Sequence, residues 1–194
     1  MEPGRNHHDE AGRSVERGGN GRPRRRPGSA PSERKPRGTA RDRALNLLSF
    51  RDRSRRELEQ RLLRAGFEPD DVLEALEALE RVGLVDDERF ARAVVEQEAG
   101  RRLSGRRAVA AALASKGVSR EVAGAALAEI DDPESERRRA EELARSRVRR
   151  MGALAPEVAY RRLAGLLARR GFSPALCHES ARRALDVESN DDHP

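Results

Sequence analysis

Few side chains in this sequence could perform catalysis or hold a metal ion. The single cysteine, Cys177, stands beside His178, and neither has a partner at the spacing of a nucleophilic triad or a zinc site. Asp86, Asp87 and Glu88 form a short acidic run, but carboxylates at the start of a helix are far commoner than a carboxylate metal site. We therefore expect no metal and no cofactor, and we interpret the chain as a non-enzyme.

The first 38 residues have the composition of a disordered tail. They contain seven Gly, five Pro and no Leu, Ile or Phe, so they cannot bury enough apolar surface to offset the entropy of folding. They hold 10 Lys and Arg against 5 Asp and Glu, a net charge of +5. His7 and His8 have no further ligand nearby, and residues 18–21 lack the Lys-Ser/Thr of a phosphate loop. The basic run at residues 22–26 suits either loose phosphate contacts or a solubilising extension.

From Thr39 onward, apolar residues recur at helical spacing in nine successive segments. Ser54 and Glu57 have the spacing of a capping box, and Pro69 suits the first turn of a helix. The expected helices carry, in order, Leu45, Leu58, Leu76, Val94, Leu113, Leu127, Leu143, Leu163 and Leu185. The sequence therefore predicts an all-α fold.

Three glycines show that the helices belong to a repeat. Gly66, Gly117 and Gly171 each end a helical pattern and each precede an apolar residue, as a left-handed helix cap requires. Cys177 lies six residues after its glycine, as Val72 and Ala123 do, which predicts a buried structural thiol. We predict three tandem three-helix repeats in an elongated, curved array. The expected segments are a disordered basic tail at 1–38, repeats at 39–85, 86–132 and 133–187, and a disordered C-terminal tail at 188–194.

The stretch from Leu84 to Phe90 is the expected joint between the first two repeats. A leucine pattern ends at Gly83, and a new apolar stripe begins at Phe90. Asp86 and Asp87 can accept hydrogen bonds from the unpaired N–H groups that open a helix. We expect them to cap and orient the helix that begins with Arg89 and Phe90.

Arginines cluster between the first and second helix of each expected repeat. Guanidinium groups suit carboxylate or phosphate, and a row of such corners would suit a long acidic partner. The alternative is that they only solvate loops and complement helix ends, since the chain has just two Lys. The clusters are Arg51, Arg53, Arg55 and Arg56; Arg101, Arg102, Arg106 and Arg107; and Arg145, Arg147, Arg149 and Arg150.

Composition sets the remaining limits. Charged residues make up 38% and aromatic residues 3%, which suits charged helices better than a β-sandwich or a large enzyme core. The net charge is +6, of which the tail supplies +5, so the remaining residues are nearly balanced. No apolar run reaches the length of a membrane span, and the N-terminus has no apolar signal region. We expect a cytoplasmic monomer.

Residues 84–91, followed by 104–109 and 113–118, resemble the central motif of the RecX regulatory proteins, and residues 44–48 and 54–62 are similar to that family's first repeat. The resemblance covers about residues 39–187. It implies three tandem three-helix repeats and a modulator, usually an inhibitor, of RecA. Such proteins lie along the groove of the RecA–DNA filament, block its growth or promote its disassembly, and so modulate recombination, DNA repair and the SOS response.

Two other functions remain open from the sequence. The repeats have the size of helix-turn-helix units, so the chain can be a sequence-independent DNA-binding module, with repeat three as the place of weak direct DNA contact. Against this stand the near-balanced charge outside the tail and the scarcity of aromatic residues for base stacking. The other possibility is a helical adaptor with a different protein partner.

Overall fold

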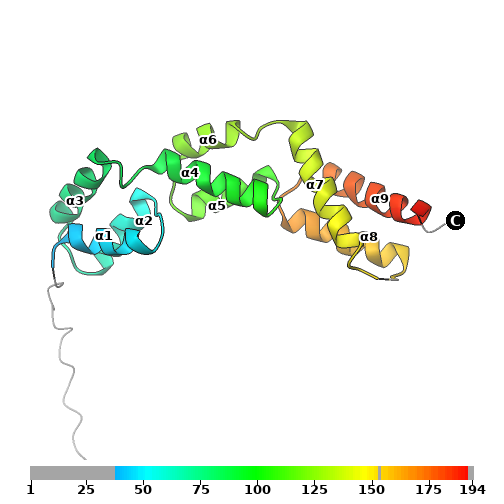
Figure 1. Ribbon diagram of the computed structural model, residues 1–194, viewed down its shortest axis with the longest axis horizontal. Coiled ribbons are helices and arrows are strands. Elements are labelled where there is room, and N and C mark those ends of the chain that lie inside the picture. The colour runs from blue at the N-terminus through cyan, green and yellow to red at the C-terminus, as the bar shows by residue number, and fades with distance from the viewer. Residues whose placement is uncertain (1–37, 153, 192–194) are drawn as a thin grey trace, which may run out of the picture. The chain divides into compact units, whose positions relative to one another are not determined.

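The computed structural model describes residues 38–152 and 154–191 (Figure 1). Within these ranges the chain forms nine α-helices and one π-helical turn, and it has no β-strand. The predicted all-α fold is confirmed. The predicted N-terminal tail lies outside the described residues except for Gly38. The last helix continues to Asp191, into the predicted C-terminal tail, and residues 192–194 lie outside the described residues.

The first three helices form the first repeat. They are α1 (Ala40–Phe50), α2 (Arg55–Arg64) and α3 (Pro69–Arg81). Thr39 and Asp42 form a complete capping box before α1. Ser54 caps α2 by accepting from the Glu57 N–H, but the Glu57 side chain does not return the bond. The capping box predicted at Ser54 is therefore only half formed, because Glu57 binds arginines instead.

The second repeat contains α4 (Asp87–Val95), α5 (Arg106–Ser115) and α6 (Arg120–Ala128). A π-helical turn, η1 (Glu96–Arg101), continues α4 directly. Leu103 follows this turn with φ +51° and packs against the core of the third repeat. The third repeat contains α7 (Pro133–Val148), α8 (Pro156–Arg169) and α9 (Pro174–Asp191).

Each repeat buries its own apolar core. The fully buried leucines Leu58, Leu62, Leu76 and Leu79 lie in the first core, and Leu113 lies in the second. In the third core, Leu163 and Leu167 are joined by other buried residues. Because each stripe is narrow, every three-helix unit closes around its own leucines and alanines, and the buried residues of the described chain form three separate clusters.

The middle helix of each repeat ends in the same way. Gly66, Gly117 and Gly171 have φ of +90°, +77° and +84°. The residue after each glycine donates its N–H to a carbonyl five residues earlier, as in Phe67 to Leu62 at 3.3 Å. This is a Schellman motif, and its left-handed position favours glycine because a Cβ there would crowd the carbonyl.

Candidate functional site

Asp87 links the first two repeats. Its Oδ1 accepts a hydrogen bond of 2.8 Å from the backbone N–H of Arg55, at the start of α2. Ser54 Oγ, from the same helix start, donates to the carbonyl oxygen of Lys116 at the end of α5 at 2.5 Å. The sequence had predicted that both Asp86 and Asp87 would cap α4. Asp86 does so, by accepting from the Arg89 N–H at 2.8 Å, whereas Asp87 satisfies a helix in the preceding repeat.

The second and third repeats meet through the same construction. The N–H of Gly105 donates to the carbonyl oxygen of Arg170 at 2.8 Å, and the N–H of Arg106 donates to Glu136 Oε1 at 2.9 Å. As at the first joint, the start of the middle helix of one repeat meets the end of the middle helix of the following repeat. The first helix of the following repeat again supplies a carboxylate. Sequence reasoning missed Glu136, because nothing in its local pattern distinguishes it from a solvated helix residue.

These joints align the middle helices head to tail. The carbonyl end of α5 meets the N–H end of α2, and the carbonyl end of α8 meets the N–H end of α5. Opposite ends of the helix dipoles therefore face each other, and N–H groups left unpaired at a helix start obtain acceptors. The corners that carry the first two arginine clusters are thus parts of these joints.

In the first corner, most of the arginines serve the fold. Glu57 binds Arg51 and Arg53 at 2.5 Å and Arg61 at 2.9 Å. Arg53 is only 8% exposed and also donates to the Leu47 carbonyl, so it cannot be the partner contact that the sequence predicted. Burial acts to raise the pKa of Glu57, but the hydrogen bonds from Arg61 and Arg53 and the charge of Arg51 outweigh it. The pKa of this carboxyl is therefore lowered.

Two more arginines of the first corner lie against neighbouring elements. Arg55 pairs with Glu80 of α3 at 2.8 Å and is about one-third exposed. The aliphatic stem of Arg56 packs against Gly117, where an added Cβ would lie 3.1 Å from it. Arg56 remains exposed, but its stem closes the joint between the first and second repeats.

The second corner is divided between paired and unpaired arginines. Arg102 pairs with Glu98 at 2.8 Å, and Arg106 pairs with Asp131 at 3.0 Å. Arg101 and Arg107 are exposed, and neither has an ion pair within the described part of the chain. These two guanidinium groups are therefore available to a partner without breaking an ion pair.

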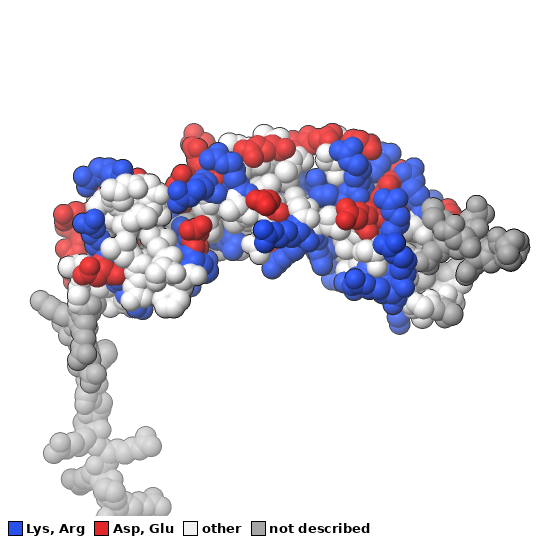
Figure 2. All heavy atoms as spheres, in the orientation of Figure 1, with Lys and Arg blue, Asp and Glu red and all other residues white. Residues whose placement is uncertain are grey.

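The third corner differs from the first two in the pairing of its arginines. Arg145, Arg149 and Arg150 are exposed and Arg147 is half-buried, and none of the four has an ion pair among residues 38–152 and 154–191. Residues 133–187 hold 13 Arg against 7 Asp and Glu, a net charge of +6. Residues 39–85 hold 9 basic and 10 acidic residues, and residues 86–132 hold 8 and 9, so each has a net charge of −1. Figure 2 shows Lys and Arg gathered over the α7 and α8 part of this face.

The other residues singled out in the sequence are buried or hydrogen-bonded to a neighbouring side chain. Phe90 is 7% exposed in the second core, with Lys116 Nζ 5.8 Å from its ring centroid. Cys177 is buried, and this burial raises the pKa of its thiol, which the charge of Arg107 offsets only in part. His178, for which sequence spacing showed no partner, shares a 2.6 Å hydrogen bond with the Tyr160 hydroxyl. Within the described ranges, no group of three or more His, Cys, Asp or Glu side chains could hold a metal ion.

None of the helices in the described ranges is both long enough and apolar enough to span a bilayer.

The fold and its joints define a class, the tandem three-helix repeat proteins, with an arginine cluster at the corner of each repeat.

Comparison with known proteins identifies the family. The first, second and third three-helix domains of RecX match residues 40–79, 86–127 and 134–179. The chain is 44% identical over 140 residues to Regulatory protein RecX of Mycolicibacterium smegmatis, covering 70% of this chain and 73% of that protein. It is 45% identical over 152 residues to Regulatory protein RecX of Mycobacterium avium, covering 77% and 86%. The chain belongs to the RecX family of regulatory proteins.

Solved structures agree on the fold. The crystal structure of RecX from Lactobacillus salivarius superposes with a TM-score of 0.63 at 21% identity, covering 75% of this chain and 94% of that chain. A second crystal structure of a regulatory protein RecX gives a TM-score of 0.62 at 24% identity, covering 71% and 68%. At these identities the likeness supports the fold alone.

Proposed function

We propose that this RecX-family chain is a regulator of RecA, and specifically an inhibitor. It binds the RecA–DNA filament along its groove as a monomer and blocks filament growth or promotes disassembly. It thereby modulates recombination, DNA repair and the SOS response in the cytoplasm, where the filament forms. It acts by binding and not by catalysis.

The observation that carries this proposal is the unpaired set of corner arginines. Arg101 and Arg107 in the second repeat and the four arginines of the third corner lack internal carboxylate partners in the described structure. Recurring cationic corners on successive repeats suit a long acidic partner, because one repeat alone offers few contacts. Among the predicted contact residues, we keep Arg101, Arg107, Arg147, Arg149 and Arg150. We set Arg102 and Arg106 aside with the arginines of the first corner, because they pair with Glu98 and Asp131.

Apolar surface in the first repeat supports a protein partner as well. Within the described residues, every large hydrophobic side chain that is more than about a third exposed belongs to this repeat. Exposed apolar side chains gathered in one region are typical of protein contact surfaces. They are Leu45, Phe50, Leu63, Leu73, Val82 and Leu84.

The test is RecA-dependent ATP hydrolysis on single-stranded DNA. We expect substoichiometric amounts of this chain to reduce hydrolysis by the cognate RecA, because one molecule bound to a filament affects many protomers. A RecA-free reaction with DNA controls for ATP hydrolysis by the chain itself. Unchanged hydrolysis by the cognate RecA would refute the proposal.

A second candidate function is sequence-independent DNA binding by the third repeat. The net charge of +6 on residues 133–187 favours it, since neutralised phosphates release counterions. Affinity for bare DNA would then fall steeply with salt, and changing Arg149 and Arg150 to Glu would reduce the slope. Binding to bare DNA that is absent at low salt would exclude this function and leave the filament proposal intact.

A further inference from the structure

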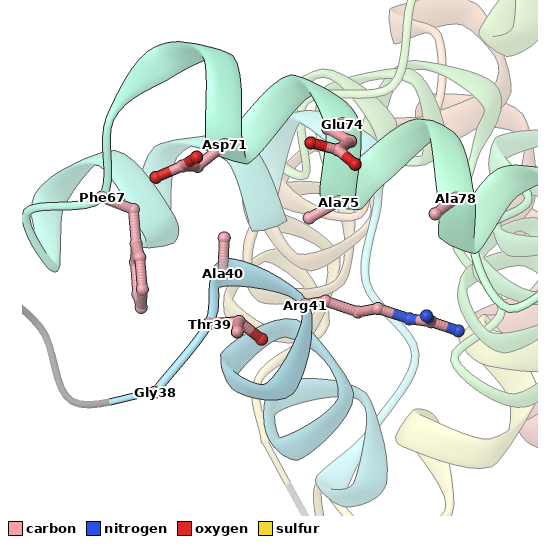
Figure 3. Close-up of a pocket in the computed structure, with 9 residues that line it drawn as sticks. All are labelled: Gly38, Thr39, Ala40, Arg41, Phe67, Asp71, Glu74, Ala75 and Ala78. Carbon is pink, nitrogen blue, oxygen red and sulfur yellow. The ribbon is translucent and has the colours of Figure 1, made fainter.

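A groove lies between the start of α1 and α3 in the first repeat (Figure 3). Its volume is about 420 Å³, and Ala40, Ala75 and Ala78 contribute apolar lining. Phe67 closes one end, and Arg41 extends toward the Ala78 end. The remaining lining comes from Gly38, Thr39, Asp71 and Glu74.

Two carboxylates on α3 border this groove. Asp71 and Glu74 are exposed, and neither has an ion pair or a side-chain hydrogen bond within the described residues. Asp70 and Glu77 are further carboxylates of α3 that have no ion pair within the described residues. The one ion pair that α3 forms within these residues joins Glu80 to Arg55. A carboxylate beside small apolar side chains suits the head and the aliphatic stem of an arginine or lysine.

In the third repeat, arginine side chains cover the position that corresponds to Glu74. Counted from the left-handed glycines, Glu179 on α9 corresponds to Glu74, and Arg183 corresponds to Ala78. Arg137 of α7 binds Glu179 at 3.3 Å, and Arg183 binds Glu179 at 3.8 Å. Arg183 also binds Glu141 of α7, so guanidinium groups from both helices bridge this position.

The side chain at this position differs in size between the two repeats. Arg183 borders a small cavity of about 60 Å³ in the third repeat, which Glu141, Arg145, Ser180 and Ala184 also line. In the first repeat the small Ala78 stands in place of this arginine and lines the groove. The first repeat therefore keeps the acceptor carboxylate but has Ala78 where the third repeat has Arg183, and the guanidinium at the Ala78 end of its groove is that of Arg41 of α1.

We propose that this groove of the first repeat receives an arginine or lysine side chain from a basic, partly apolar segment of a protein partner. The stem of the incoming side chain lies on the alanines, and its head binds Asp71 and Glu74. The proposal deepens the proposed function, which supplies the identity of the partner, but the recognition chemistry is testable without RecA.

The first experiment titrates the full-length chain with the acetylated, amidated peptide Ala-Leu-Arg-Ala-Ala-Leu-Arg while methyl NMR spectra are recorded. We expect saturable shifts at the methyl groups of Ala40, Ala75 and Ala78. A peptide with Glu in place of both Arg is the matched ligand control. No saturable shift, or equal shifts with both peptides, would overturn the proposal.

Variants of the groove sharpen the test. Asp71→Asn combined with Glu74→Gln should weaken peptide binding at least tenfold, since both acceptors lose their charge. Ala78→Arg should also block the peptide, because it introduces the guanidinium that Arg183 supplies in the third repeat. Glu142→Gln is the control and should bind as the unmodified chain does, because Glu142 on α7 is exposed and has no ion pair within the described residues. Peptide affinity unchanged in both groove variants would refute the site.

The partner and the chain's own basic residues must be distinguished. If the peptide shifts appear only after residues 1–37 are deleted, the chain itself competes for the groove, and the proposal of a partner segment is wrong. Filament binding is then measured for Ala78→Arg, with a weakened complex expected. A RecA that is unaffected by the unmodified chain refutes the proposed function, whereas loss of the peptide interaction refutes only this inference.

Discussion

The Asp87 carboxylate caps a helix that begins 32 residues earlier in the chain, by accepting the N–H of Arg55 at 2.8 Å. The neighbouring Asp86 caps its own helix through the N–H of Arg89. Of these two adjacent carboxylates, Asp86 therefore caps its own helix, and Asp87 caps a helix that is distant in the sequence. The acidic joint seen in the sequence fixes the start of α4 and attaches it to α2.

Replacing Asp87 by Ala should weaken the contact between the first two repeats. The expected loss of unfolding free energy is about 0.5 to 2 kcal/mol, the usual value for a lost helix cap. Urea unfolding followed by circular dichroism measures it. Glu88→Ala is the control, because Glu88 is 72% exposed and its one ion pair among the described residues is a 3.9 Å contact with Arg92. Equal losses in the two variants would contradict the role of Asp87.

Replacing Gly171 by Ala should destabilise the second joint more than Gly83→Ala destabilises its loop. Both glycines have positive φ, and the strain of a left-handed alanine costs about 1 to 2 kcal/mol. At Gly171 the added Cβ would also lie 2.3 Å from the backbone nitrogen of Ala108, whereas at Gly83 nothing lies within 4 Å. Thermal unfolding of the two variants tests this difference. Similar melting temperatures would show that the joint accommodates the added Cβ with little loss of stability.

The stability of the first repeat should depend on pH through Glu57. Its pKa in the folded chain is lowered from 4.5, so the stabilisation from its arginines is present above about pH 4.5. It is lost as the pH falls from that value through the lower pKa of the folded state. Glu57→Gln should cost about 1 to 3 kcal/mol near pH 7, as expected for lost charged hydrogen bonds. It should also remove part of the acid destabilisation.

The control for this prediction is Glu59→Gln on the same helix. Glu59 has no ion pair among the described residues, so its replacement should leave the pH profile unchanged. Urea midpoints measured between pH 3 and pH 7 compare the two variants. A pH profile that is the same for Glu57→Gln and the unmodified chain would contradict the assignment.

Charge reversal at the unpaired arginines should weaken filament binding without unfolding the chain. We expect Arg101→Glu with Arg107→Glu, and separately Arg149→Glu with Arg150→Glu, to lower inhibition of RecA-dependent ATP hydrolysis at least tenfold. Arg43→Glu with Arg64→Glu in the first repeat is the matched control, since these arginines lie outside the corners. Equal inhibition by folded corner variants and the control would remove the corner arginines from the contact.

Deletion of residues 1–38 should leave filament binding unchanged, because we assign the contacts to the arginine corners of the repeats. The measurement is the same ATP hydrolysis assay at matched concentrations of truncated and full-length chain. Circular dichroism verifies that the truncated chain is folded, since the deletion ends beside Thr39, the cap of α1. Loss of inhibition by a folded truncated chain would assign the contact to the tail.

Local patterns in the sequence determined much of this fold. Helical periodicity, the proline starts and the glycine ends are properties of a few neighbouring residues, so they predicted the helices and the recurring caps. The motif from Leu84 to Ala91 pointed to the RecX family, which the three matching domains confirm. The buried position of Cys177 followed from its place in the repeat.

Only the tertiary structure decided what the charged side chains do. Arg53 and Arg149 look alike in the sequence, yet Arg53 is buried against Glu57 and Arg149 is exposed without an ion pair in the described structure. Asp87 and Glu136 find their partners in other repeats, at sequence separations of 32 and 30 residues. The physical reason is range: helix formation depends on neighbours within a few turns, whereas an ion pair or an inter-repeat cap depends on where packing brings distant residues together.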